Sequence, residues 1–203
     1  MPDLSLPEID AQRSVFINCP YDPEYEPLYD ALVFTIVCCG FIPRSATESG
    51  KVSVSRMERI FHAINTSAFS IHDLSRCHGE GEKVLARFNM PFELGIALFR
   101  RQKDGSEQHD WLVLVPESAP YARYISDLAG YDLKPYDGKV ESIVRSVMAW
   151  LMTQPGAIPG LSPSPVIANL EKFRKAKIKL KAEWNEIPWP LLIRLAVENA
   201  PEF

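Results

Sequence analysis

The sequence predicts an α/β domain in which a five-stranded parallel sheet is covered by helices on both faces. Short apolar runs, typical of buried strands, alternate along the chain with longer segments whose apolar residues recur at helical spacing. This alternation is typical of parallel sheets, and right-handed crossovers leave few strand orders. We expect the flavodoxin-like order 2-1-3-4-5, in which strands one and three are neighbours and a crevice opens at their carboxyl ends.

Each element is predicted from local pattern. Strands are expected where apolar residues run together, at 14–19, 41–47, 68–73, 111–116 and, as a weaker edge strand, 131–136. Helices are expected where apolar residues fall at i, i+3 and i+4, at 25–39, 57–64, 92–101, 121–129 and 140–152. Ser53 or Ser55 can cap the second of these helices.

Length and composition limit the possible domain organisation and the class of protein. The 203 residues divide into a flexible lead-in (1–13), an α/β domain (14–154), a Pro/Gly-rich linker (155–165) and a helical extension (166–203). A formal net charge of −4 argues against a dedicated nucleic-acid or membrane binder. The first residues lack a signal-peptide pattern, and four cysteines without paired spacing indicate a reduced, cytoplasmic protein.

The helical extension is basic. We expect most of this charge to form a solvated helix face, with contact to nucleic acid or an acidic partner as the alternative. The basic residues are Lys172, Arg174, Lys175, Lys177, Lys179 and Lys181.

The segment from Asn89 to Leu98 reads Asn-Met-Pro-Phe-Glu-Leu-Gly-Ile-Ala-Leu and places one carboxylate, Glu93, in the first turn of a predicted helix. The strand before this helix ends in a second carboxylate, Asp73. The N-terminus of a helix carries a partial positive charge, which favours an ionised Glu there. A carboxylate kept anionic at this edge of the sheet can act as a nucleophile or stabilise a cation. The alternative is that Glu93 only complements the helix dipole.

Other chemistries lack their usual motifs. No glycine-rich phosphate loop follows the first strand, and no Gly-x-Ser-x-Gly sequence is present. His72, Cys77 and His78 have no fourth ligand at a typical spacing, so we expect no metal, with zinc as the alternative. Cys19 beside the crevice suits either a thiol nucleophile or a small buried residue. We expect no cofactor, with NAD considered only as a substrate.

A pair of carboxylates suits cleavage of a glycosidic bond. Departure of a base from ribose builds positive charge on the sugar, which one carboxylate can stabilise or trap. The other can bind a sugar hydroxyl or move a proton. We therefore expect Glu93 and Asp73 to be the catalytic residues.

Two loops can supply the substrate contacts. Asn18, Pro20 and Tyr21 follow the first strand and are expected to line the base or ribose site, with Tyr21 stacking on the base. Arg44 and Glu48 follow the second strand and can reach a phosphate and a ribose, although Arg44 also suits a surface ion pair.

Three segments carry a resemblance to nucleoside 2-deoxyribosyltransferases. Val15-Phe-Ile-Asn-Cys-Pro-Tyr resembles the opening strand of that family, and Ile71-His-Asp-Leu-Ser resembles its third-strand Asp segment. Phe92-Glu-Leu-Gly-Ile-Ala resembles its Phe-Glu-x-Gly-x-Ala helix start, where the family's Glu is the nucleophile. The same plan is similar to Toll/interleukin-1-receptor-like (TIR) domains, in which a Glu in a comparable place cleaves NAD. The resemblance covers residues 14–152.

The resemblance implies an enzyme that cleaves or transfers at the N-glycosidic bond of a nucleoside, a nucleotide or NAD. It also implies a role as a nucleotide-depleting effector in bacterial antiviral defence. The approach to Glu93, Arg87-Phe-Asn-Met-Pro, lacks the Asp of the transferases' Asp-Gly-Thr-like stretch, and Asn89 takes its place. Hydrolysis with water as the acceptor is therefore an equal alternative to transfer.

Two other functions stay open. The same crevice can belong to a non-catalytic nucleotide-binding or signal-sensing module, and the basic C-terminal helix can belong to a scaffold. As partners we expect a small-molecule nucleoside, nucleotide or NAD, together with a second copy or a partner protein bound through the C-terminal helices. We expect neither a membrane nor a nucleic acid as a partner.

Overall fold

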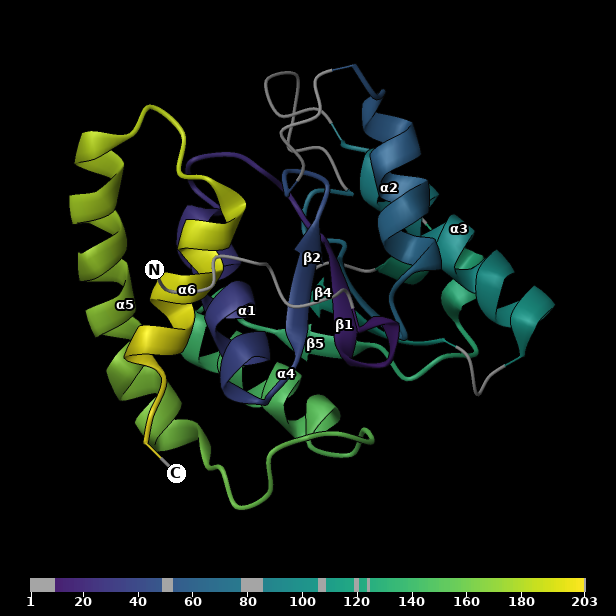
Figure 1. Ribbon diagram of the computed structural model, residues 1–203. Coiled ribbons are helices and arrows are strands. Elements are labelled where there is room, and N and C mark those ends of the chain that lie inside the picture. Colours follow the sequence, from purple (N-terminus) through teal and green to yellow (C-terminus); the bar gives the residue numbers. More distant parts are fainter. Residues whose placement is uncertain are drawn as a thin grey trace.

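A computed structural model describes residues 10–48, 53–77, 86–105, 109–118, 121–123 and 125–202. The chain forms an α/β domain around one five-stranded sheet in which all neighbouring strands are parallel (Figure 1). The strand order is β2-β1-β3-β4-β5, which confirms the predicted flavodoxin-like arrangement. The five strands are β1 (Ser14–Asn18), β2 (Ile42–Ser45), β3 (Phe69–Asp73), β4 (Asp110–Pro116) and β5 (Lys134–Tyr136).

Helices cover both faces of this sheet. The α-helices are α1 (Glu26–Cys38), α2 (Arg56–Asn65), α3 (Asn89–Asp104), α4 (Val140–Leu151), α5 (Pro163–Glu183) and α6 (Trp189–Asn199). The predicted cap of α2 is confirmed at Ser55: its hydroxyl accepts from the Glu58 N–H at 3.2 Å, and the Glu58 carboxylate accepts from the Ser55 N–H at 2.9 Å.

Alternation along each strand divides the sheet into two faces, because successive side chains point to opposite sides. Val15 and Ile17 of β1 share one core with the apolar faces of α1 and α4. Phe16, between them, packs instead with residues of α2 and α3. In β3 the same rule points Ile71 toward α1 and α4. Its two neighbours, Ser70 and His72, point toward α2 and α3.

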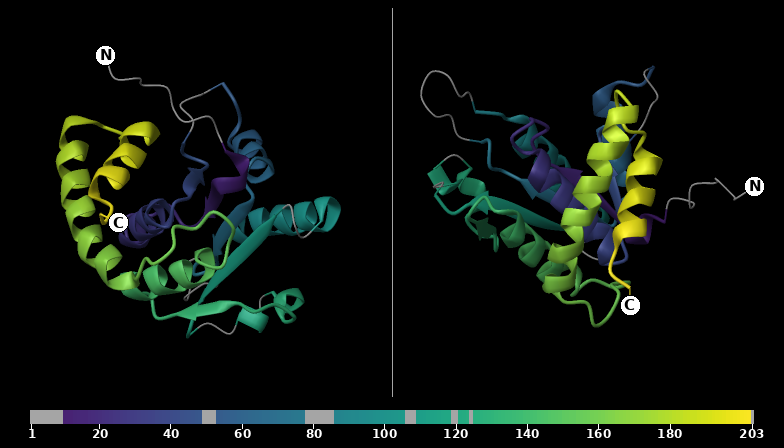
Figure 2. Two further views of the ribbon diagram at one scale, coloured as in Figure 1. Left: turned by 60° about the horizontal axis from the view of Figure 1, so that its bottom comes forward. Right: turned by 90° about the vertical axis from the view of Figure 1, so that its left-hand side faces the viewer.

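The C-terminal extension is part of the main hydrophobic core. Helices α5 and α6 pack outside α1 and α4 (Figure 2), and the Phe173 ring stacks on Phe34 of α1 at 5.1 Å between centroids. The predicted linker is shorter than expected, because α5 already begins at Pro163. A proline is well tolerated there, since the first N–H groups of a helix have no helical partner. The extension residues in the core are Val166, Leu170, Phe173, Leu192 and Ala196.

One basic residue of the extension does not belong to a solvated face. Lys177 is buried and donates to Asp30 of α1 and, at 3.1 Å, to Glu26. Lys181 also reaches Glu26, at 3.0 Å. The sequence pattern did not reveal this pairing, because the partners lie about 150 residues apart in the chain.

Two further expectations need correction. Where one helix was predicted over 121–129, the described residues form two 3₁₀ turns, Tyr121–Arg123 and Ser126–Leu128. The expected lead-in is partly ordered, because Ala11–Arg13 forms a 3₁₀ turn and the Ala11 carbonyl accepts from the Ala68 N–H at 2.7 Å. The rest of the lead-in, residues 1–9, lies outside the described residues.

Among the described residues, no helix combines the length and the apolar character needed to cross a membrane.

Candidate functional site

Glu93 lies in the second turn of α3, one turn later than the sequence predicted. The helix begins at Asn89, so its first turn contains Pro91 and no acidic residue. Proline is compatible with a first turn, because the N–H that it lacks would have no partner there. The prediction that the unpaired N–H groups at the start of the helix keep Glu93 ionised is therefore wrong.

Burial dominates the electrostatics of Glu93. The residue is only 4% exposed. Loss of solvent disfavours the ionised form and raises the pKa of the Glu93 carboxyl to about 7, while the nearby Arg56 guanidinium opposes this rise. A carboxyl with this pKa exchanges its proton near neutral pH, which suits general acid–base chemistry, and above about pH 7 it is ionised and can act as a nucleophile.

Arg56 connects Glu93 with Tyr21. Its guanidinium Nη2 lies 3.8 Å from the Glu93 Oε1, and its central carbon lies 5.6 Å from the centre of the Tyr21 ring. The Arg56 side chain is 49% exposed and Tyr21 is 38% exposed. A cation and an aromatic surface therefore stand at the protein surface beside the carboxyl.

Asp73 faces the other side of the sheet. As the last residue of β3 it follows Phe69 and Ile71 in the alternation, toward α1 and α4. Its Oδ2 accepts from the hydroxyls of Tyr25 at 2.8 Å and Tyr136 at 2.7 Å, and its Oδ1 accepts from the Ser75 N–H at 2.8 Å. Burial raises the pKa of the Asp73 carboxyl, and these hydrogen bonds oppose the rise.

The two predicted carboxylates thus share no hydrogen-bond partner among the described residues. Cys19 lies near both: burial raises the pKa of its thiol well above the usual value, and the charges of Asp73 and Glu93 raise it further. A thiol in this environment stays protonated, which favours the small buried role over the nucleophilic one.

Asn18 contacts the start of α3 and does not face an open crevice. It is buried at the end of β1, and its amide nitrogen lies 2.8 Å from the Met90 carbonyl oxygen and 2.8 Å from the His72 Nδ1. Pro20 is also buried, whereas Asn89 is exposed as the first residue of α3. Of the residues expected to bind substrate, Tyr21 and Asn89 are therefore the accessible ones on this side.

Arg44 and Glu48 bind each other. The Arg44 Nε lies 2.8 Å from one Glu48 carboxylate oxygen and 2.9 Å from the other, and Glu48 also accepts from the Ser45 N–H at 3.1 Å. The Ser45 hydroxyl lies 3.0 Å from the Tyr21 hydroxyl. The ion pair expected as an alternative for Arg44 is present, but Arg44 is buried and Glu48 is half-buried. Through Ser45 the pair connects to the loop that carries Tyr21.

Residues proposed as zinc ligands do not form a cluster in the described part of the chain. Both ring nitrogens of His72 lie within hydrogen-bond distance of protein groups, at 2.8 Å from Asn18 and 2.8 Å from Ser70. Cys77 is a buried free thiol, and His78 lies outside the described residues. No group of three or more potential ligands occurs among the residues that the structure describes.

A cavity of about 490 Å³ opens at the carboxyl ends of β3, β4 and β5, beside the start of α1. Glu93 does not line it. Its walls bring together tyrosines, acidic groups and one arginine, with the Tyr25 and Tyr136 hydroxyls bonded to Asp73 behind them. The polar lining residues include Tyr25, Ser75, Arg76, Glu117, Tyr136 and Asp137.

Sequence reasoning missed Arg56, Tyr25 and Tyr136. The Ser55 capping signal, which places the start of α2 at the next residue, could have indicated Arg56. Tyr25 and Tyr136 carry no such signal, because only the fold brings them to Asp73 from 48 and 63 positions away.

Comparisons with known proteins add nothing to these geometric observations. Neither a model of a protein family nor a curated protein matches the chain.

Proposed function

We propose that the protein cleaves or transfers at the N-glycosidic bond of a nucleoside, a nucleotide or NAD, with Glu93 as the reacting carboxylate. One observation carries the proposal: a nearly buried carboxyl, with a pKa of about 7, lies beside an accessible cation and an accessible aromatic ring. A base can stack on Tyr21, and Arg56 can bind a substrate phosphate. Arg56 thereby takes the role expected of Arg44 and favours a nucleotide or NAD over a free nucleoside.

In the proposed reaction the C1′–N bond breaks and its electron pair leaves with the base. The ionised Glu93 stabilises the positive charge on the sugar or forms an ester bond to C1′. Attack by water then gives the sugar, sugar phosphate or ADP-ribose without its base, and the proton that the water loses passes to the departed base or, from NAD, to solvent. Attack by a second base instead gives a new nucleoside or nucleotide. Asp73, which binds Tyr25 and Tyr136, maintains the carboxyl edge of the sheet in this scheme. Depletion of NAD or nucleotides by hydrolysis would suit the antiviral role that the resemblance implies.

The test is chromatography of NAD and a panel of nucleosides and nucleotides after incubation with purified protein. Wild type and the control Glu141→Gln, an exposed substitution on α4, should release free base, whereas Glu93→Gln should release none. Equal release by wild type and Glu93→Gln would overturn the role of Glu93.

A second candidate is a non-catalytic nucleotide-binding or sensing module. It is favoured by the cavity beside Asp73, which Glu93 does not line. In that case the ligand would be recovered unchanged, and Arg76→Ala in the cavity wall would weaken binding more than Glu93→Gln.

A further inference from the structure

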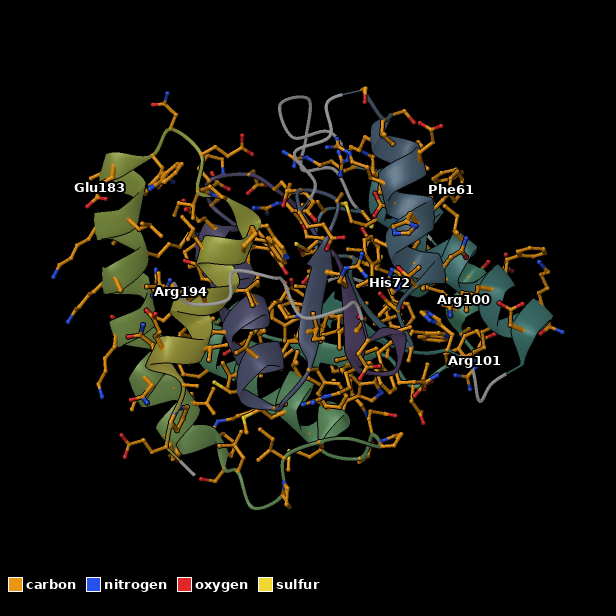
Figure 3. All side chains as sticks on the ribbon, in the orientation of Figure 1. Phe61, His72, Arg100, Arg101, Glu183 and Arg194 are labelled. Atoms are coloured by element: carbon orange, nitrogen blue, oxygen red, sulfur yellow. The ribbon has the colours of Figure 1, made fainter. Side chains whose placement is uncertain are left out.

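Two buried histidines, His72 and His109, take no part in the proposed chemistry, yet they lie in one hydrogen-bonded chain beneath α3. The chain begins at Asn18 on β1, crosses His72 and Ser70 on β3, and reaches His109 just before β4. Figure 3 shows His72 and Arg100 on the side of the sheet that α2 and α3 cover.

The direction of these bonds follows from chemistry. A carbonyl oxygen can only accept, so the Asn18 nitrogen, 2.8 Å from the Met90 oxygen, donates to it. The same nitrogen lies 2.8 Å from the His72 Nδ1, which must therefore accept. His72 consequently carries its proton on Nε2 and donates to the Ser70 hydroxyl at 2.8 Å.

The far end of the chain is anchored to the protein as well. The Ser70 hydroxyl lies 3.0 Å from the His109 Nε2, and the His109 Nδ1 lies 2.9 Å from the Ser67 carbonyl oxygen. Arg100, from the later part of α3, also donates to the Ser67 carbonyl. The chain therefore connects both ends of α3 to the sheet.

Burial keeps both rings neutral, since loss of solvent lowers the pKa of His72 to about 3 and that of His109 to about 4. A protonated His72 would present a donor to the Asn18 nitrogen and break the bond. The neutral ring therefore fixes the orientation of the Asn18 amide at physiological pH.

We infer that Asn18 is a positioning residue for Glu93, because its amide joins the end of β1 to the first turn of α3. Glu93 follows Met90 by three residues, so the height of this turn above the sheet determines how deeply the carboxyl is buried. Phe88, the residue before α3, makes no side-chain capping bond, so among the described residues the bond from Asn18 is a buried restraint on that turn. The catalytic consequence rests on the proposed function, whereas the positioning does not.

Among the described residues, the groups that interact with Glu93 include Arg56, at the start of α2, and Cys19 and Tyr21, in the loop after β1. None of them is changed by a substitution at Asn18. A change in the titration of Glu93 would therefore report a change in its position and solvation.

The experiment titrates the side-chain ¹³C carboxyl signal of Glu93, identified by its loss in Glu93→Gln, in wild type and in Asn18→Leu. Leucine has nearly the shape of asparagine but cannot donate. We expect the midpoint to fall by at least one pH unit, as the released turn lets water reach the carboxyl. Base release should fall at least tenfold in kcat, with KM changed less than threefold.

Two controls separate positioning from general destabilisation. Thr35→Val alters a buried side chain of α1 on the opposite face, and Ile143→Ala removes core contacts of α4 there. Both should leave the Glu93 midpoint at its wild-type value. Ser70→Ala, which removes the group that His72 donates to, should shift the midpoint in the same direction as Asn18→Leu and provides a second variant if the first does not fold.

A wild-type midpoint in folded Asn18→Leu, or in Ser70→Ala if Asn18→Leu does not fold, would overturn the inference. Equal shifts in the two controls would overturn it too. The readout needs no substrate, so a shifted midpoint in Asn18→Leu together with no base release by wild type would refute the proposed function and leave the positioning role supported.

Discussion

The guanidinium of Arg56 lies 3.8 Å from a carboxyl oxygen of Glu93, although the two residues come from different helices. Arg56 is the first residue of α2, and Glu93 is the fifth residue of α3. Burial favours the neutral carboxyl and Arg56 favours the ionised one, and the balance gives Glu93 a pKa of about 7. Small changes around this pair should therefore change both the activity and the stability of the protein.

Activity should rise with pH if Glu93 reacts as a carboxylate. Base release per enzyme should increase through about pH 7 and reach a plateau above it, as the carboxyl ionises. Arg56→Gln removes the cation that lowers this pKa, so the midpoint should move to higher pH. Rate profiles of wild type, Arg56→Gln and the exposed control Arg145→Gln would measure the effect. A rate that falls with pH would indicate a general acid instead.

Stability should show the opposite trend. The pKa of Glu93 rises from 4.5 to about 7 on folding, so the folded state binds the proton more tightly. This contribution is complete below about pH 4.5 and is lost as the pH rises through 7. At about pH 8 the buried charge costs wild type about 3 kcal/mol, which Glu93→Gln avoids.

Urea unfolding at about pH 5 and pH 8 would test this prediction. Glu93→Gln should be clearly more stable than wild type at the higher pH and similar to it at the lower pH, whereas Glu141→Gln should track wild type at both. An advantage that does not change with pH would contradict the role of ionisation.

The hydrogen bonds of Asp73 should contribute to stability. Tyr136→Phe removes one of the two hydroxyl donors to Asp73 and should lower the free energy of unfolding by about 1–2 kcal/mol. It should also raise the pKa of Asp73 further, because a bond to the ionised form is lost. Tyr131→Phe, at an exposed position, is the matched control and should change stability little. Equal effects of the two substitutions would show that the bond contributes nothing.

The ion pair between Lys177 and Asp30 should join the C-terminal helices to α1. Lys177→Met leaves the Asp30 carboxyl buried without this partner and should destabilise the domain by about 3 kcal/mol. Lys179→Met, two residues further along α5 and exposed, should have little effect. Denaturant midpoints of the two variants would decide. If they agree, the ion pair between Lys177 and Asp30 contributes nothing measurable to the packing of α5 on α1.

Local patterns predicted much of the fold. The apolar strands, the helical spacing and the Ser55 cap depend on residues close together in the sequence, and the parallel order follows from the alternation of strands and helices. Local pattern does not determine where α3 begins, because Pro91 suits either a loop or a first helical turn. The two 3₁₀ turns between β4 and β5 have too little periodicity to be distinguished from one short helix.

By itself, the sequence determined the α/β class, the strand order and the presence of Glu93 near the carboxyl edge of the sheet. Only the tertiary structure decided what each polar residue meets. Adjacent residues of a strand face opposite layers, so His72 joins the Asn18 chain beneath α3. Asp73 instead binds Tyr25, the residue just before α1, and Tyr136 of β5. Arg56 and Lys177 acquired their partners in the same way, because packing brings together charges that no local pattern relates.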